Sequence, residues 1–279
     1  MKTFGLFLTQ YPPLRRSKAT PLGMMFAIAL WLFAPNTATA QNSVQRDPQA
    51  LTVITQVIAA GGGQELLSSI QDLTETGAIT YNWADTVSGN VTVKIRGLHQ
   101  FRIDADLPKG TRTTVVSGEG GSVKQVSGWT LSISRQSAND LGSLTVPYLP
   151  LIAAMQDSST SIAYVGPVTH DGTPAYDIRL MKVYSKEQDP TGSRGEQEER
   201  DFYINPQTFL VVAISDQIHF EGRDDKGIPH EDLYSNYQSE NGIMVPLTIV
   251  ETVSGVIGVT LNFNQVTFNS GLADSDFSW

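Results

Sequence analysis

Most of the chain after residue 77 alternates apolar and polar side chains with a period of two. The clearest runs are residues 91–96 and 256–268. Successive side chains of a β-strand point to opposite faces of a sheet, so each run predicts a strand with one apolar and one polar face. The side chains expected to point inward are Val91, Val93, Ile95, Ile257, Val259, Leu261 and Phe263.

Two other segments repeat their apolar residues at helical spacing. They are residues 49–71, interrupted by Gly61-Gly62-Gly63, and residues 147–156. The triple glycine lacks the Gly-Lys-Ser/Thr ending of a phosphate loop and follows a helix, so we interpret it as a corner between two helices. The apolar side chains that these helices offer to the core include Leu51, Ile54, Ile58, Leu67, Leu151, Ile152 and Met155.

Turn signals separate the predicted strands. Asn241-Gly242 is the strongest hairpin signal, and Asp171-Gly172 is another. Short strands joined by such turns predict an antiparallel meander of about nine to eleven strands. The expected fold class is mainly β with a few α-helices: a single highly curved antiparallel sheet, a half-open β-barrel, with helices covering its concave face.

A wide one-sided sheet exposes an apolar face that other elements must cover. The predicted helices are too small to fill the concave side of a strongly curled sheet. We therefore expect an apolar cavity beneath residues 49–71 and 147–156, with the inward-facing residues of the strands and helices named above as its candidate lining. The alternative is a concave side filled entirely by its own side chains.

Residues 186–201 have almost no apolar side chains, and strand patterns resume on both sides of them. This composition predicts a mobile hairpin loop inside one domain that spans residues 41–279. A binding flap is the alternative interpretation.

The first 40 residues resemble a secretory signal peptide. Four basic and no acidic residues precede an apolar stretch from Leu22 to Ala34. Pro35 and the small residues Ala38-Thr39-Ala40 follow it. The stretch is shorter than the roughly 20 residues of a membrane-spanning helix. We expect cleavage before Gln41 and export to the periplasm or beyond, by the general or the twin-arginine route, and no transmembrane span in the mature chain.

Composition narrows the possible partners. Without the leader, 15 Lys and Arg face 28 Asp and Glu, a net charge of −13. Such a surface repels nucleic acid and anionic lipid headgroups. The chain has no cysteine, which excludes disulfides, thiol nucleophiles and thiolate metal sites. We expect a monomer.

The chain shows no motif for catalysis. Its four histidines, His99, His170, His219 and His230, form no HExxH or other paired spacing, and no G-x-S-x-G is present. We interpret the histidines as surface residues and expect no catalytic site, no metal and no cofactor.

Five segments resemble the LolA/LolB-like superfamily of periplasmic lipoprotein carriers and the related RseB-type sensors. They are the helix and glycine corner, three hairpins with their turn residues, and the ending Val266-Thr267-Phe268-Asn269. The segments cover residues 59–62, 165–176, 202–210, 234–246 and 266–277.

The resemblance implies the half-closed sheet described above, and in the carriers its cavity holds acyl chains. The expected function is an exported, non-catalytic protein of the cell envelope that binds a hydrophobic ligand, such as a lipid or a lipoprotein acyl chain. An envelope sensor or scaffold that binds a protein partner is the alternative, and an unrecognised secreted hydrolase is a second.

Overall fold

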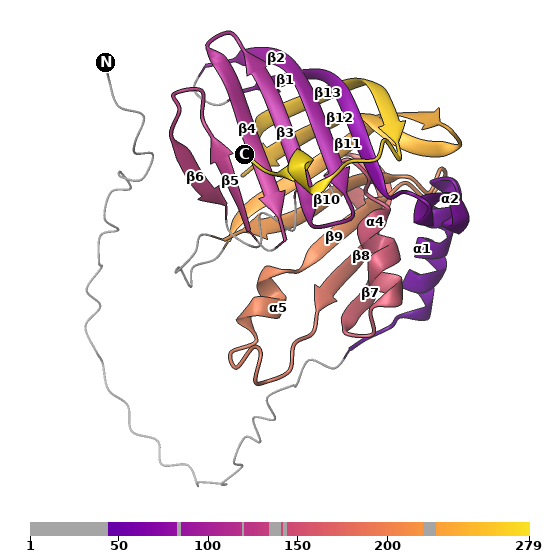
Figure 1. Ribbon diagram of the computed structural model, residues 1–279. Helices are drawn as coiled ribbons and strands as arrows, with labels where there is room; N and C mark the ends of the chain where they lie inside the picture. Colours follow the sequence, from indigo (N-terminus) through magenta and orange to yellow (C-terminus); the bar gives the residue numbers. More distant parts are fainter. Residues whose placement is uncertain (1–43, 83–84, 119, 134–140, 142–143, 220–226) are drawn as a thin grey trace, which may run out of the picture. The chain divides into compact units, whose positions relative to one another are not determined.

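One antiparallel sheet of 13 strands dominates the structure, and its two ends do not meet to close a barrel (Figure 1). The computed structural model describes residues 44–82, 85–118, 120–133, 141, 144–219 and 227–279. The strand order is β6-β5-β4-β3-β2-β1-β13-β12-β11-β10-β9-β8-β7. The strands are β1 (Asp72–Tyr81), β2 (Val87–Arg96), β3 (Gln100–Leu107), β4 (Gly110–Ser117), β5 (Gly120–Lys124), β6 (Thr130–Ile133), β7 (Thr160–His170), β8 (Thr173–Lys182), β9 (Arg200–Ile204), β10 (Val211–Ile218), β11 (Ile228–Glu240), β12 (Ile243–Val253) and β13 (Val256–Phe268).

This architecture confirms the expected fold class. The described helices are α1 (Pro48–Ala60), α2 (Gln64–Ser68), α4 (Leu149–Gln156), α5 (Ser193–Gln197) and the 3-10 helix η1 (Asp274–Phe277). The sheet has more strands than the sequence predicted, because short strands such as β5 and β6 lack a clear apolar alternation. None of the helices in the described part of the chain has the length and apolar character needed to span a bilayer.

Period-two alternation holds along β2, where Val91, Val93 and Ile95 are all buried. In β13 it holds only in part. Leu261 and Phe263 are buried, but Ile257 is 48% exposed, so its inward assignment was wrong. The register between β12 and β13 shifts at Glu251/Thr252. A bulge adds one residue to a strand and thereby moves every side chain beyond it to the opposite face.

The glycine corner brings α1 and α2 against the sheet. The backbone carbonyl of Gly61 accepts a hydrogen bond of 2.9 Å from the amide of Met244 in β12. A Cβ at Gly62, whose φ is +130°, would lie 2.7 Å from the carbonyl oxygen of Gly242. Only glycine permits this close approach in that backbone conformation. The interpretation of the triple glycine as a helix–helix corner is confirmed.

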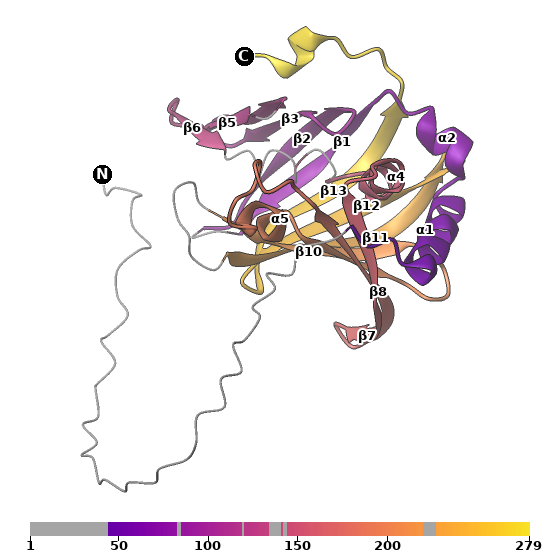
Figure 2. The ribbon, with the colours of Figure 1, turned by 90° about the horizontal axis from the view of Figure 1, so that it is seen from below.

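Helix α4 lies on the concave side of the sheet, where Figure 2 shows it end-on beside α1 and α2. Its inner face carries the buried side chains of Leu151 and Ile152. Arg46 fixes the end of this helix, because its guanidinium donates hydrogen bonds of 2.7 Å to the carbonyl of Ala154 and 2.8 Å to that of Met155. These carbonyls have no partner within the helix, so the arginine acts as a C-terminal cap.

The polar segment between β8 and β9 contains more structure than the sequence predicted. Helix α5 lies within it, and β9 already begins at Arg200. The carboxylate of Asp189 accepts a hydrogen bond of 3.1 Å from the amide of Gly195 at this helix. Residues 186–201 are therefore only partly irregular, and their mobility stays a prediction.

Residues after β13 cross the polar outer face of the sheet. The carboxylate of Asp72 accepts hydrogen bonds from the amides of Ser270, Gly271 and Leu272, at 2.7, 3.0 and 3.1 Å. Farther along, Lys94 pairs with Asp276 at 2.6 Å. These contacts hold the C-terminal segment across β2 and β3. Residues 41–279 form one compact unit, and the predicted signal peptide lies outside the described residues.

Candidate functional site

An apolar cavity of about 290 Å³ lies on the inner side of the sheet. Its wall comes from one face of β1, β3, β12 and β13, and further apolar side chains come from β5, β6, β10 and the segment before α4. The apolar lining consists of Ile79, Phe101, Ile103, Val123, Ile133, Leu141, Leu144, Ile218, Ile249, Val259 and Leu261. Several of these, including Ile133, Ile218 and Val259, are only partly buried, so the cavity reaches the surface.

The structure brings Val259 and Leu261 of the predicted lining into this cavity. The other buried members of the predicted set pack in the continuous core instead, and Leu51 and Met155 pack against that core while partly exposed. No residue of α1, α2 or α4 is among the described lining residues. Our prediction placed the cavity beneath those helices, and the structure places it beside them.

The position of the cavity follows from where the helices pack. Helix α1 packs against β7, α2 and α4, and its buried side chains, including Val53, Ile54 and Val57, belong to the continuous core there. Helices α1, α2 and α4 add no side chain to the lining of the opposite side, toward β3–β6. There the segment carrying Leu141 and Leu144 supplies the only described apolar cover from outside the strands.

Tyr81 and Arg112 mark one polar end of the cavity. The Arg112 guanidinium lies 5.0 Å from the centre of the Tyr81 ring and donates a hydrogen bond of 2.9 Å to its hydroxyl. Burial raises the pKa of Tyr81, and Arg112 opposes this shift. Among the described residues, no carboxylate lies within ion-pair distance of Arg112. The guanidinium thus stands at an apolar cavity with a neutral partner.

A second hollow of about 520 Å³ shares Tyr81 and Arg112 with the apolar cavity. Lys109 lines it as well, and its described lining contains no Asp or Glu. The described lining of this hollow is therefore basic in a chain with a net charge of −9, whereas the apolar cavity, which Arg112 also lines, contains Glu251 and Asp232. Together the two hollows place a basic region next to an apolar one.

His230 forms a second polar group in the cavity wall. Its Nδ1 lies 2.8 Å from Oδ1 of Asp216, and its Nε2 lies 3.7 Å from Oε1 of Glu251. Burial alone would lower the pKa of His230, but Asp216, Glu251 and Asp232 together raise it to about 11. The imidazole is therefore held in its cationic form and neutralised by its own carboxylates.

The prediction that His230 is a surface residue was wrong, since its side chain is only 11% exposed. A signal was present in the sequence: His230, Asp232 and Tyr234 alternate in one strand and share its inner face. Arg112 and Tyr81 gave no such signal, because a polar residue in an alternating strand is normally assigned to the outer face.

One further acid is enclosed in the core. Glu75 has no exposed surface, and neither carboxylate oxygen has a hydrogen bond of full geometry among the described residues. Burial raises the pKa of Glu75 to about 8, although the nearby hydroxyl of Thr145 opposes the shift. The carboxyl is consequently protonated, and thus uncharged, at neutral pH.

Comparison with known proteins gives a structural likeness without a sequence match. No family model matches the chain, and no curated protein matches it in sequence. A LolA superfamily protein from Nitrosomonas europaea aligns with a TM-score of 0.52 and 13% identity, over 82% of this chain and 97% of that one. A DUF1329 family protein from Desulfovibrio piger aligns with a TM-score of 0.51 and 9% identity, over 84% and 98%. The chain therefore has the fold of the LolA superfamily, as the sequence resemblance predicted.

Proposed function

We propose that this protein is an exported, non-catalytic binding protein that shelters the hydrocarbon part of an amphipathic ligand in the apolar cavity. One observation carries the proposal: a surface-reaching cavity of about 290 Å³ whose lining is mostly aliphatic. Its volume is close to the lower end of the roughly 300–1,000 Å³ typical of small-molecule sites. Each methylene moved from water into such a site contributes about 0.8 kcal/mol.

The polar end of the site favours an anionic headgroup. Arg112 and Lys109 line the adjoining hollow, and no Asp or Glu is among its described lining residues. A guanidinium binds a carboxylate or phosphate through paired hydrogen bonds. His230 does not compete for this role, because Asp216 and Glu251 already neutralise its charge. The ligand class is thus an acyl chain with a carboxylate or phosphate head.

The fold supports a carrier role. The fold is similar to that of a LolA superfamily protein, and the family resemblance of the sequence implies acyl-chain binding. The expected leader of residues 1–40 places the protein outside the cytoplasm, where a lipid in transit needs protection from water.

A cavity-filling variant tests the proposal. Val259→Phe adds volume inside the cavity, so a fluorescent fatty acid should bind at least about 10-fold more weakly than to the wild type. Val256→Phe is the matched control, since Val256 lies in the same strand and is 61% exposed. Saturable binding that is equal in both variants would place the ligand elsewhere.

Extraction of the purified protein with organic solvent, followed by mass spectrometry, identifies any bound ligand. A protein partner is the second candidate. Trp129 and Leu131 of the β5–β6 hairpin favour it, because they are 54% and 44% exposed at an edge of the sheet. The absence of lipid from the extract, together with no saturable binding at micromolar protein, would support this second candidate.

A further inference from the structure

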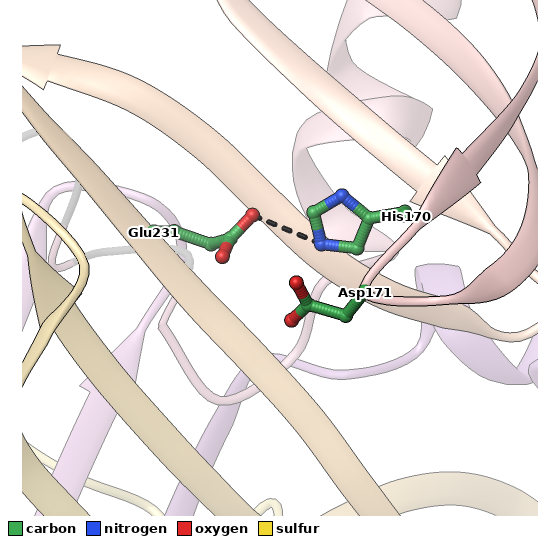
Figure 3. A group of neighbouring side chains, drawn as sticks. All are labelled: His170, Asp171 and Glu231. Carbon is green, nitrogen blue, oxygen red and sulfur yellow. Dashed lines mark ion pairs between the residues drawn. The ribbon is translucent and has the colours of Figure 1, made fainter.

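His170 and Glu231 meet on the face of the sheet opposite the cavity. His170 ends β7 and Glu231 lies in β11, with β8, β9 and β10 between them in the sheet. Neighbouring strands lie about 4.8 Å apart, so a flat sheet would separate these strands by roughly 19 Å. Instead, Nε2 of His170 lies 3.0 Å from Oε1 of Glu231 (Figure 3).

The β7–β8 hairpin is shaped to make this contact. Its register shifts between Tyr164 and Gly166, and a bulge of this kind bends a hairpin. The imidazole ring of His170 then stacks on Tyr203 of β9, with 4.0 Å between ring centres and 15° between planes. The stacking restricts the ring orientation and directs Nε2 toward β11.

Asp171 completes the group. It is the first residue of the hairpin turn, and its φ of 45° turns the chain directly after His170. One ligand atom from each of His170, Asp171 and Glu231 lies within 4.8 Å of the others, and Figure 3 shows the three side chains converging. Asp171 is exposed, which leaves a path from solvent to the group.

These donors suit a divalent transition metal. An imidazole nitrogen and carboxylate oxygens bind Zn²⁺ at about 2.0–2.2 Å, and two ligands of a tetrahedral ion are then about 3.4 Å apart. The separation of 3.0 Å between Nε2 and Oε1 is close to that value. The ligand oxygen of Asp171 lies within 4.8 Å of both of these atoms.

The hydrogen bonding of His170 is incomplete. Its Nε2 atom is buried, and among the described residues no acceptor or donor makes a hydrogen bond of full geometry to it. A buried ring nitrogen without a hydrogen bond costs free energy, which a bound metal would recover. The contact with Glu231 is an ion pair, and it does not provide Nε2 with a well-aligned hydrogen bond.

Glu231 also borders a hollow of about 290 Å³, whose lining includes Glu196, Glu199 and Asp201. Glu199 and Asp201 pair there with Arg179, at 3.0 and 2.7 Å. The carboxylates of Glu231 and Asp171 lie close together in this group. A divalent cation would relieve the repulsion between the two carboxylates.

We propose that His170, Asp171 and Glu231 bind one divalent transition-metal ion, with Zn²⁺ the best fit, and leave a remaining coordination position to water. The ion fastens the bent β7–β8 hairpin to β11. The site lies on the opposite face of β11 from His230 and Asp232, which line the cavity, so it is separate from the proposed ligand site.

Isothermal titration of the purified, tag-free and chelator-treated protein with zinc chloride tests the proposal. We expect one Zn²⁺ per chain and a rise in melting temperature that EDTA reverses. Glu231→Gln and Asp171→Asn should each weaken binding by about 100-fold or more, since even outer-shell changes cost 10–100-fold. Asparagine tolerates the same turn conformation, so Asp171→Asn keeps the hairpin intact.

His99→Ala and Glu240→Gln are the controls, because both residues lie outside the group and should leave the stoichiometry unchanged. A crystal soaked in zinc chloride should show anomalous scattering between His170 and Glu231. Two results would overturn the proposal: no saturable zinc binding at micromolar protein, or binding that survives both the Glu231→Gln and the Asp171→Asn changes.

Discussion

At the scale of single residues, the polar groups enclosed by the sheet carry most of what is particular to this protein. Arg112, Glu75 and His230 all lie on the inner side of the sheet. Each is accommodated differently: Arg112 by a tyrosine, Glu75 by taking up a proton, and His230 by carboxylates. Two of them give predictions that separate binding from stability.

The first residue-scale prediction concerns Arg112. Arg112→Gln should weaken binding of dodecanoate by about 10-fold, because a hydrogen bond to a charged group contributes roughly 1.5–3 kcal/mol. Binding of the uncharged methyl ester should not change. Fluorescence displacement measures both affinities. Arg102→Gln is the control, since Arg102 pairs with Asp104 on the outer face. An equal loss for acid and ester would show that Arg112 acts only on the shape of the cavity.

The second concerns the pH dependence of stability. The folded state holds the proton of Glu75 up to a pKa of about 8, above its ordinary value of 4.5. Between these two values the unfolded chain has lost the proton and the folded chain has not, so the free energy of unfolding falls as pH rises and levels off above about pH 8. The slope is on the order of 1 kcal/mol per pH unit.

Glu75→Gln should remove this slope and stabilise the protein at pH 8 relative to the wild type. Urea denaturation at several pH values measures it. Glu65→Gln, at an exposed position of α2, should behave like the wild type. A wild-type slope that persists in the Glu75→Gln protein would assign the pH dependence to other groups.

At the scale of elements, bulges decide which face of a strand is buried. β13 shifts register against β12 at one point and against β1 at another. Val259, Leu261 and Phe263 therefore face inward, but Ile257 does not. Strict alternation, applied along the whole strand, assigned all four residues to one face.

Three substitutions in β13 test this description. Leu261→Asp places a charge in the core and should cost on the order of 3 kcal/mol or more. Asn262→Asp should be mild, because Asn262 is exposed and its side-chain oxygen still accepts the hydrogen bond from Thr248. Ile257→Asp should also be mild. Thermal melting ranks the three, and a large loss for Ile257→Asp would contradict the bulge.

At the scale of the whole molecule, the proposed binding function requires both the predicted signal peptide and the apolar cavity. A carrier of hydrophobic ligands in the cell envelope must first be exported, and the composition of residues 1–40 predicts a signal peptide. N-terminal sequencing of the exported protein should find Gln41 as its first residue. An exported or cytoplasmic protein that still begins at Met1 would contradict the assigned site of action.

The sequence by itself determined the fold class, the helices at residues 49–71 and 147–156, the glycine corner and the hairpin turns. These features depend on local chemistry: side-chain periodicity, helix and turn propensity, and backbone freedom at glycine. Val91, Val93 and Ile95 were assigned to the core correctly because nothing in β2 interrupts the alternation.

Only the tertiary structure decided where the cavity lies and which polar residues surround it. The cavity is the part of the concave face that α1, α2 and α4 leave uncovered, and that depends on how far each short helix reaches across the sheet. The contact of His170 with Glu231 depends on a bulge that bends the β7–β8 hairpin toward β11, past β9 and β10. Such contacts join residues that are far apart in the chain, so the local pattern of apolar and polar residues does not predict them.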